Sequence, residues 1–424
     1  MERNILILGA GKSSIALIDY LIEHAKTENW QVTVADITHT LAEQKAKGRP
    51  HTIALGFNLN NDDERRALIA KADIVISMLP AALHLTVAHD CLVLKKNLVT
   101  PSYISDDMKA LAPEVEAAGL LFMNEMGLDP GIDHMSAMQL IDGLKAKGAT
   151  ITGFKSHCGG LVAPQSDTNL WHYKFTWNPR NVILAGQGDG GIHYLMNGEK
   201  VNLKYEELFG RATQLQVEGY GEFESYPNRD SLKYISEYGL DGIATMYRGT
   251  LRVPPFCFGW DMLVQMGLTA EKEIPVAYLI QKVVANMPMD EVRISLLEST
   301  GVLDALNALT EETVSPAKLL QSLLEQRWMM QPGDKDMIVM VHQVEYKKLW
   351  MKKKLQSSLV YIGANEEHTA MATTVGLPVA IVTKMILNGE VKRKGVLMPK
   401  YADIYNPILK ALEHYGVKFN EKEI

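Results

Sequence analysis

Three residues near the N-terminus have the spacing of a phosphate-binding turn: Gly9, Gly11 and Ser14. They follow the apolar run of residues 4–8 and open a helical pattern over residues 13–25. Gly9 permits a tight turn, and Gly11 has no Cβ, so a pyrophosphate can approach the backbone closely. The free N–H groups at the helix N-terminus then face the anion. This spacing predicts a dinucleotide site; a glycine turn in a sheet without a ligand is the alternative.

Asp36 closes the next apolar segment, residues 31–35. At the end of the second strand of a dinucleotide-binding unit, a carboxylate accepts hydrogen bonds from the adenosine ribose. The same carboxylate would repel a 2′-phosphate, so we expect NAD as the cofactor and disfavour NADP. The alternative is an aspartate that caps the following turn.

Asp129 is a candidate for chemistry at the nicotinamide end of the crevice. It lies in the segment NEMGLDPGIDH, residues 124–134, after the last strand of the alternating pattern. Asp129 and Pro130 also have the pattern of a helix N-cap followed by proline at the first helical position, so capping stays open as an alternative. The helix that follows is expected to extend to about Lys147.

Cys158 ends a strand-like run and is followed by Gly159 and Gly160. A lone cysteine is most often a small buried apolar residue, while neighbouring glycines suggest a close approach to the backbone. The sequence holds no HExxH, GxSxG or P-loop motif and no Cys/His metal spacing. Metal hydrolases, serine hydrolases and P-loop NTPases are therefore excluded, and we expect no metal site.

Strands and helices alternate up to about residue 123, which predicts an α/β fold with a doubly wound parallel sheet and right-handed crossovers. Ligands of such sheets lie outside the carboxyl ends of the strands, so the loops 77–80 and 100–103 are expected to line the crevice. Further strands are expected at residues 51–55, 72–79, 97–100 and 120–123, and helices at 62–71, 81–95 and 106–118.

After Gly127 the pattern changes to a mixed or antiparallel sheet, then to short helices and again to extended structure. The expected segments are a sheet over residues 150–247, helices over 269–328, a hairpin over 337–362 with a solvated lysine run, and a helix over 370–388 kinked at Pro378. A second domain is therefore expected to be inserted into the first. The predicted domains are 1–127 plus about 363–395, 128–265 plus about 334–362, and a small helical domain at 266–333.

Composition limits the class of protein. The 424 residues are 47% hydrophobic and 22% charged, which excludes disorder over most of the length. Three cysteines favour a reducing compartment. No stretch looks like a signal peptide or a membrane span of roughly 18 apolar residues. With a net charge of −7, the chain is expected to have neither nucleic-acid nor membrane partners.

Five ordered motifs resemble the saccharopine reductase family, the glutamate-forming saccharopine dehydrogenases: NEMGLDPGIDH, SHCGGLVAP, YKFTWNPR, YPNRDS and YRGTLR. TPSYIS before them and MATTVGLPVAI after them match as well. The resemblance implies a variant Rossmann domain, an α/β substrate and dimerisation domain, a small helical domain and a cytoplasmic homodimer. It also implies reduction of the imine between glutamate and 2-aminoadipate semialdehyde to saccharopine, and the reverse oxidation, in lysine metabolism.

The resemblance also assigns site residues by motif matching. It implies cofactor contacts at Gly9, Gly11, Lys12, Ser13, Leu79, Ser102, Leu128 and Asn178. It implies saccharopine contacts at Tyr103, Asp129, Arg229, Thr250 and Arg252, with Cys158 near the reacting atoms.

Two positions depart from the fungal enzymes of this family, which use NADP. Asp36 stands where they have arginine, so the residue itself argues for NAD. His172 stands where family members often have glycine, which would narrow the substrate cleft.

Saccharopine has three carboxylates and a secondary amine, so its site needs positive charge in an acidic protein. An arginine can hold a carboxylate through two parallel hydrogen bonds, and Pro227 is expected to hold Arg229 rigidly. The alternative for any arginine is a surface ion pair. We expect hydride to pass between the nicotinamide and the imine carbon. Tyr103 and Asp129 are candidates for hydrogen bonds to the reacting amine, and Cys158 is a candidate for tuning the protonation of that network. No single general base is assigned.

Two other classes of function stay open on the same scaffold. One is an oxidoreductase that acts on a smaller amino acid or a carboxylated polyamine. The other is a regulator that binds NAD without catalysis.

Overall fold

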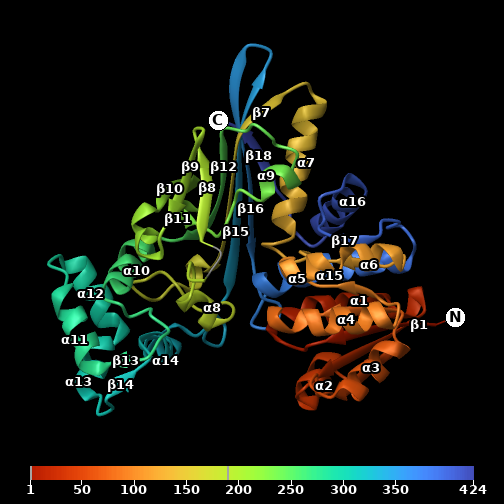
Figure 1. The fold of residues 1–424 in the computed structure, drawn as a ribbon, viewed down its shortest axis with the longest axis horizontal. Coiled ribbons are helices and arrows are strands. Elements are labelled where there is room, and N and C mark those ends of the chain that lie inside the picture. Colours follow the sequence, from red (N-terminus) through yellow and green to blue (C-terminus); the bar gives the residue numbers. More distant parts are fainter. Residues whose placement is uncertain (1, 189–190) are drawn as a thin grey trace. The chain divides into compact units, whose positions relative to one another are not determined.

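The computed structural model describes residues 2–188 and 191–424 (Figure 1). Residues 189 and 190, within the sheet expected over 150–247, lie outside this description. The chain divides into two compact units. Unit 1 comprises Met1–Gly143 and Glu367–Lys418, and unit 2 comprises Leu144–Glu366 and Phe419–Ile424.

Unit 1 is built on a seven-stranded sheet in which every strand pair is parallel. The strand order is β17-β6-β5-β4-β1-β2-β3, so the first six strands have the 3-2-1-4-5-6 order of a dinucleotide-binding fold. The predicted doubly wound sheet is confirmed. The strands are β1 (Arg3–Leu8), β2 (Trp30–Asp36), β3 (Thr52–Gly56), β4 (Ile74–Ser77), β5 (Asn97–Val99), β6 (Leu121–Met123) and β17 (Gly395–Leu397).

Helices and short 3-10 turns connect these strands, as the alternating pattern predicts. The helix expected over 106–118 is split at Leu111, because Pro113 in the second piece has no N–H to continue the first helix's hydrogen-bond ladder. The elements are η1 (Lys12–Ser14), α1 (Ile15–Glu28), α2 (His39–Ala46), α3 (Asp62–Lys71), η2 (Ala81–Leu83), α4 (His84–Val93), α5 (Asp106–Ala110) and α6 (Ala112–Ala117).

Helix α7 (Ile132–Ala146) follows β6, and it begins two residues after Pro130. Pro130 therefore does not occupy the first helical position, so the alternative of an Asp129–Pro130 capping pair does not hold. The backbone instead makes a closed loop, in which the Gly127 N–H donates to the Pro130 carbonyl (2.9 Å) and the Ile132 N–H donates to the Gly127 carbonyl (2.9 Å). Asp129 therefore lies in this loop, before the first residue of the helix.

The chain returns to unit 1 through α15 (Ala370–Leu387), β17 and α16 (Ala402–Glu413). This return extends to residue 418, beyond the predicted limit near 395. Gly376 lets α15 pack closely on α1, since a Cβ there would lie 2.8 Å from the Leu17 nitrogen. By length and apolar composition α15 could cross a membrane, contrary to the expectation that no such stretch exists, but most of it is buried inside unit 1. It continues through Pro378 as one helix.

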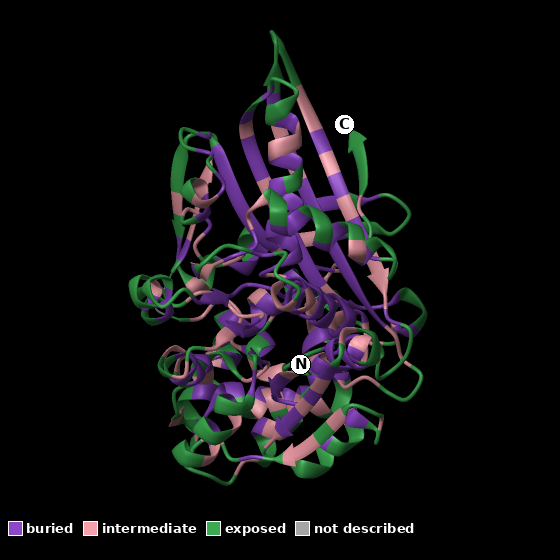
Figure 2. Cartoon of the chain, turned by 90° about the vertical axis from the view of Figure 1, so that its right-hand side faces the viewer, coloured by how far each residue is buried: buried purple, intermediate pink, exposed green. Residues whose placement is uncertain are grey.

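Unit 2 contains a nine-stranded mixed sheet, as predicted. Its central path is β10-β11-β12-β7-β15-β16-β18, and β8 and β9 pair beside β12. In Figure 2 the long central strands are largely purple, which marks burial, whereas the strand at the C-terminus is green, which marks exposure. The strands are β7 (Thr150–Val162), β8 (Ile192–Met196), β9 (Glu199–Leu203), β10 (Thr213–Val217), β11 (Gly221–Pro227), β12 (Thr245–Arg252), β15 (Asp336–Lys348), β16 (Met351–Ile362) and β18 (Asn420–Glu423).

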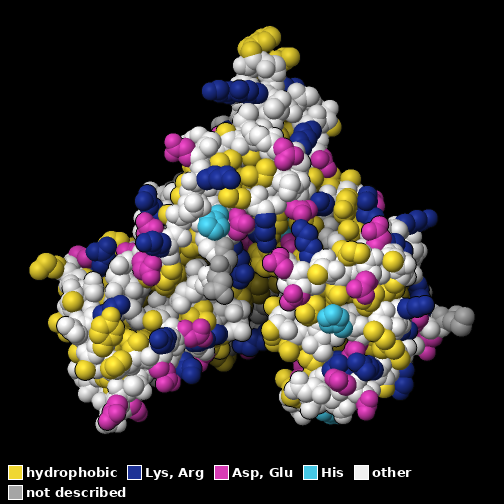
Figure 3. Space-filling model, in the orientation of Figure 1, with side chains coloured by type: hydrophobic (Ala, Val, Ile, Leu, Met, Phe, Trp, Pro, Cys, Tyr) yellow, Lys and Arg dark blue, Asp and Glu magenta, His cyan; other side chains and the backbone are white. Residues whose placement is uncertain are grey.

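The lysine-rich run lies in the β15–β16 hairpin, which is the solvated hairpin expected from the sequence. Leu349 and Trp350 at its turn are 75% and 86% exposed. In Figure 3 the turn forms a hydrophobic tip above dark blue lysine and arginine side chains.

The helices of unit 2 pack around a buried aromatic cluster that contains Trp171, Trp260 and Trp328. Together with a short strand pair, they match the prediction of packed helices over 269–328; their separate status as a domain stays a prediction. The elements are η3 (Pro164–Ser166), α8 (Pro179–Ile183), η4 (Tyr205–Glu207), η5 (Phe209–Arg211), α9 (Tyr234–Glu237), α10 (Phe256–Gln265), β13 (Ile274–Pro275), α11 (Val276–Ala285), α12 (Glu291–Thr300), α13 (Val302–Ala308), β14 (Thr313–Val314) and α14 (Pro316–Trp328).

Candidate functional site

The glycine turn between β1 and α1 has space for a phosphate group. Gly9 has a φ of +104°, and a Cβ on it would lie 3.0 Å from the backbone of Met78, at the end of the adjacent strand β4. A Cβ on Gly11 would meet nothing within 4 Å. The two glycines therefore have different roles: Gly9 allows the turn to pass β4, and Gly11 leaves open space over the helix N-terminus.

The residues around this turn fit a dinucleotide pyrophosphate. Ser14 is buried, and its hydroxyl donates to the Gly11 carbonyl at 2.7 Å, so it closes the turn from inside. Lys12 is exposed beside the turn, and Ser13 is half-buried. Leu79, at the end of β4, is also half-buried and packs on the core of unit 1.

Asp36 is engaged by the protein's own backbone. One carboxylate oxygen accepts from the Ala10 N–H at 2.8 Å, and the other accepts from the Thr38 N–H at 2.9 Å. Asp36 thus ties the glycine turn to the end of β2, and it also caps the next turn, the alternative use of this residue.

Ser102 is held by a buried histidine that the sequence analysis did not single out. The His84 Nε2 lies 2.7 Å from the Ser102 Oγ and 3.1 Å from the Thr100 Oγ1, and its Nδ1 lies 2.8 Å from the Ser77 Oγ. His84 therefore joins the carboxyl ends of β4 and β5. Because burial lowers its pKa to about 4, the ring is neutral at physiological pH and has one donor and one acceptor for these hydroxyls.

The buried neutral His84 should make the stability of the protein depend on pH. Its pKa is near 6.5 in the unfolded chain and about 4 in the folded one. Above pH 6.5 both states hold the ring neutral, and between pH 6.5 and 4 only the unfolded state binds the proton. The free energy of unfolding should therefore fall with falling pH in this window, by at most roughly 3 kcal/mol from this group. Urea unfolding at pH 7.5 and 5.0 measures the change.

The matched variants for this prediction are His84→Gln and His414→Gln. The first should show a smaller loss of stability between the two pH values than the unmodified chain. The second replaces an exposed histidine on unit 1 and should behave like the unmodified chain. Equal losses in all three proteins would contradict the role of His84.

Tyr103 and Asp129 lie together in unit 1. The Tyr103 hydroxyl donates to the Asp129 Oδ1 at 2.8 Å, and both residues are half-buried. A carboxylate only accepts hydrogen bonds, so the tyrosine proton is directed at Asp129 and the lone pairs of the tyrosine oxygen are oriented away from it. This arrangement provides an acceptor for an N–H group. Leu128, the neighbour of Asp129, is buried.

In unit 2, a row of side chains crosses three strands. Strand register aligns Tyr226 of β11 with Thr250 of β12, and Thr250 with Cys158 of β7. Arg252 lies two residues after Thr250 and shares its face of the sheet. The structure thus brings Cys158, Thr250 and Arg252 together. Gly159 is explained by close strand packing, since a Cβ there would lie 2.7 Å from the Leu251 carbonyl oxygen.

Arg252 is a buried cation that forms no ion pair with any carboxylate of the described residues. Its Nη1 donates to the Leu251 carbonyl (2.9 Å) and its Nη2 to the Tyr226 hydroxyl (3.3 Å), while its Nε has no hydrogen-bond partner. The guanidinium lies 4.9 Å from the ring of Tyr173 and 5.0 Å from that of Phe256. A guanidinium has five N–H donors, and only two of those of Arg252 are bonded to described residues. The rings of Tyr173 and Phe256 form an aromatic box around it, so the group is suited to bind a carboxylate.

The remaining predicted residues of unit 2 lie outside this row. Arg229 is exposed in the loop after β11, with a φ of +53°, and its carbonyl accepts from the His193 N–H at 3.2 Å. Asn178 is the N-cap of α8 and accepts from the Arg180 N–H. His172 is half-buried, and its Nδ1 lies 2.6 Å from the Asp167 carboxylate.

The predicted residues are divided between the two units. Unit 1 holds the glycine turn, Asp36, Leu79, Ser102, Tyr103, Leu128 and Asp129, and unit 2 holds Cys158, Asn178, Arg229, Thr250 and Arg252. Sequence reasoning missed His84 and the aromatic box around Arg252. The sequence offered one signal for these rings, because the motifs YKFTW and YPNRDS, which precede YRGTLR in the chain, contain aromatic residues.

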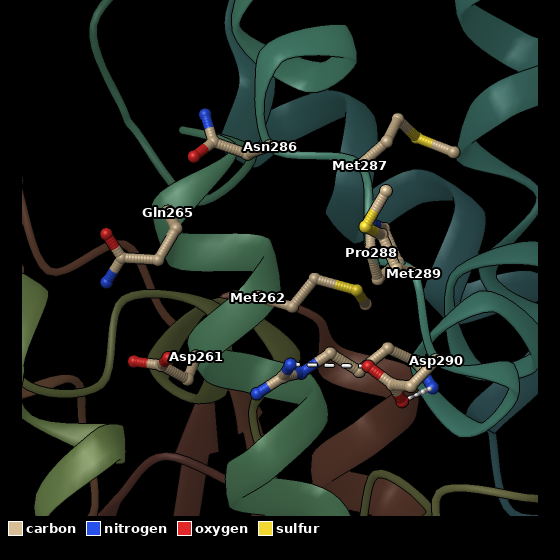
Figure 4. A pocket seen from close by; sticks show the side chains of 9 residues that line it. Asp261, Met262, Gln265, Asn286, Met287, Pro288, Met289 and Asp290 are labelled. Carbon is tan, nitrogen blue, oxygen red and sulfur yellow. Dashed lines mark hydrogen bonds and ion pairs between the residues drawn. The ribbon is translucent and has the colours of Figure 1, made fainter.

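A cavity of about 620 Å³ in unit 2 holds none of the predicted residues (Figure 4). Figure 4 shows Met287 and Met289 on the segment before α12, across from Met262 on α10. The full lining is Asp261, Met262, Gln265, Asn286, Met287, Pro288, Met289, Asp290 and Arg293.

Two family models match the chain. Residues 5–123 match the saccharopine dehydrogenase NADP binding domain, and residues 127–417 match the saccharopine dehydrogenase C-terminal domain. The chain is 33% identical to the Saccharomyces cerevisiae saccharopine dehydrogenase [NADP(+), L-glutamate-forming] and 31% identical to that of Pyricularia oryzae, over 100% of this chain and at least 99% of each relative.

Longer relatives match as well. The chain is 33% identical to the alpha-aminoadipic semialdehyde synthase of Bos taurus over 99% of this chain and 47% of the relative, so it spans about half the length of that protein.

Two solved structures resemble the chain over its full length. The Saccharomyces cerevisiae saccharopine dehydrogenase superimposes with a TM-score of 0.87 and 31% identity, covering 100% of both chains. A homospermidine synthase from Legionella pneumophila has a TM-score of 0.60 at 10% identity, covering 100% of this chain and 92% of its own, which shows a shared fold alone.

These findings correct the expected cofactor. The prediction of NAD from Asp36 is wrong, because the matched domain is an NADP binding domain and the fungal relatives are NADP(+) enzymes. The physical reason lies in the hydrogen bonds of Asp36. Its two carboxylate oxygens accept from the N–H groups of Ala10 and Thr38, so Asp36 has a structural role in the turn that does not require a ribose, and its presence does not by itself decide the cofactor.

The two family models together extend over most of the chain, and full-length relatives share more than 30% identity with it. This chain therefore belongs to the saccharopine dehydrogenase family.

Proposed function

We propose that the chain is an NADP-dependent, glutamate-forming saccharopine dehydrogenase. The full-length similarity to the two fungal enzymes supports this activity, and the observation that carries it is the buried Arg252 without an ion-pair partner. A multi-acid amine would supply the carboxylate partner for Arg252 that no described residue provides. The cofactor, when bound, exchanges a hydride with the carbon attached to the substrate nitrogen.

The chain's own groups bind and orient in this proposal. The turn at Gly9 and Gly11 and the first N–H groups of the following helix hold the cofactor phosphates. Arg252 binds one substrate carboxylate through two parallel hydrogen bonds, and the exposed Arg229 binds another. The Tyr103 oxygen accepts the N–H of the substrate amine, while Asp129 keeps the tyrosine proton directed away from it. Cys158 lies beside Thr250 and is assigned to the same substrate site.

Steady-state oxidation of saccharopine tests the function. We expect turnover with NADP, release of glutamate, and a kcat/KM for NADP at least about tenfold above that for NAD, which corresponds to roughly 1.4 kcal/mol. Diamines and carboxylated polyamines serve as control substrates. Turnover of these without turnover of saccharopine would contradict the proposal, as would binding of NADPH without turnover on any of them.

The homodimeric state and the cytoplasmic location belong to the same proposal. They are supported only by the resemblance to the family.

A further inference from the structure

A buried acid–histidine cluster lies beneath Tyr103 and Asp129 in unit 1. Its members are Glu125, Asp133 and His134, which are 3%, 1% and 0% exposed. The proposed function assigns no role to them. Burying a charged side chain costs desolvation free energy unless it is paired. Three such residues next to a proposed substrate contact therefore indicate a role at that contact.

Glu125 holds the backbone on both sides of Tyr103. Its N–H donates to the Ser102 carbonyl at 3.0 Å, and its Oε1 accepts from the Ile104 N–H at 2.9 Å. Glu125 itself has a φ of +56°, in the left-handed region that costs energy for any residue with a side chain. Such a conformation persists where the surrounding contacts determine it fully.

The other oxygen of Glu125 holds the segment that carries Asp129. It lies 2.7 Å from the Nε2 of His134, in the first turn of α7. Beside it, the Asp133 Oδ1 accepts from the Gly131 N–H at 2.6 Å, which fixes the end of the loop that holds Asp129. One carboxylate thus connects the Tyr103 segment to the Asp129 segment.

We propose that Glu125 and His134 form a positioning pair that sets the distance between the Tyr103 hydroxyl and the Asp129 carboxylate. Neither residue touches the substrate; they act through Tyr103. The inference rests on the proposed function, because the Tyr103 oxygen is the acceptor for the substrate amine. A displacement of about 1 Å at a reacting group can cost on the order of 100-fold in rate, so a rigid connection at this point has a kinetic effect.

The test is a double-mutant cycle of Glu125→Gln and Tyr103→Phe, with kcat for saccharopine oxidation as the main measurement. Gln has nearly the same shape and can still accept from the Ile104 N–H, but it replaces a carboxylate oxygen opposite His134 by a neutral group. We expect kcat to fall about tenfold in the presence of Tyr103 and less than about twofold in the Tyr103→Phe background. The Kd for NADPH, measured by fluorescence, should change less than about threefold in all variants.

Two further variants separate positioning from a merely structural effect. His134→Gln should reproduce the tenfold loss of kcat from the other side of the pair. Thr383→Val, on α15 of the same unit, replaces a buried hydroxyl that donates to the Val379 carbonyl at 2.7 Å, and it should leave kcat unchanged. Thermal unfolding of each variant verifies that it folds.

Three outcomes overturn parts of this account in distinguishable ways. An equal loss of kcat from Glu125→Gln with and without Tyr103 would show that the pair does not act through Tyr103. Unchanged kcat in Glu125→Gln and His134→Gln would refute the pair while leaving the proposed function intact. Absence of saccharopine turnover in the unmodified chain would refute both.

Discussion

Replacing Arg252 by methionine should lower kcat/KM for saccharopine by about 10²- to 10³-fold, mostly through a higher KM. Removing one partner of a buried, hydrogen-bonded charge pair costs about 2–5 kcal/mol of binding free energy, because the other charge is left without its partner. Arg252→Lys should recover only part of the loss, since an ammonium cannot form two parallel hydrogen bonds. Steady-state kinetics with saccharopine measure both effects.

The same substitution should not destabilise the free protein. Arg252 is a buried cation without an ion-pair partner among the described residues, so an apolar side chain of similar length removes a desolvation cost. We expect the melting temperature of Arg252→Met to be equal to or above that of the unmodified chain, whereas an arginine with a purely structural role would lower it.

Arg65 provides the matched control. It is buried as well, but its Nε lies 2.5 Å from the Asp90 carboxylate. Arg65→Met should lower stability by up to about 3–5 kcal/mol and leave the KM for saccharopine unchanged. If the two variants gave the same pattern, with unchanged KM and lower stability, Arg252 would not be the carboxylate site.

Gly11→Ala should fold normally and lose affinity for NADPH by on the order of 100-fold, or roughly 2.7 kcal/mol. Its φ of −65° is one that alanine adopts readily, and the added Cβ meets no protein atom within 4 Å. The methyl group would instead occupy the space in which the pyrophosphate approaches the backbone. Fluorescence titration with NADPH, together with thermal unfolding, separates the two quantities.

Gly9→Ala is the contrasting variant. Its φ of +104° is unfavourable for alanine, and the Cβ would lie 3.0 Å from the backbone carbonyl of Met78. We expect a loss of about 1–3 kcal/mol in the free energy of unfolding in addition to weaker binding. Unchanged NADPH affinity in Gly11→Ala would show that the cofactor phosphates do not bind at this turn.

The alternating apolar segments of the first 123 residues predicted the parallel sheet correctly because each buried strand is encoded locally. A continuous apolar run such as residues 4–8 is typical of a parallel strand that is covered by helices on both faces. The Lys-rich hairpin and the short helices of unit 2 were also predicted, because their sequence patterns are local too. The break at Leu111 was missed, although Pro113 was visible, because the amphipathic pattern extends across it.

The NAD prediction from Asp36 and the capping alternative for Asp129 did not hold, because each of these carboxylates has a partner far away in the chain. Asp36 was assigned from its position after β2, but its carboxylate bonds to Ala10, on the turn after β1. Asp129 had the local pattern of a helix cap, but its partner is the Tyr103 hydroxyl. In both cases the carboxylate could accept a hydrogen bond from several donors, and the fold decides which donor lies within reach.

The amino-acid sequence by itself determined the family, the parallel sheet of the first domain and the candidate residues, since periodicity and motifs are local properties. Only the tertiary structure decided which of these residues lack an internal partner. We proposed Arg252 as a carboxylate site because the rings of Tyr173, Tyr226 and Phe256 lie near its guanidinium and no carboxylate of the described residues forms an ion pair with it. We proposed Glu125 as a positioning residue because it joins two loops. A hydrogen bond or an ion pair depends on distances of about 3 Å, and distances between segments far apart in sequence are set by packing.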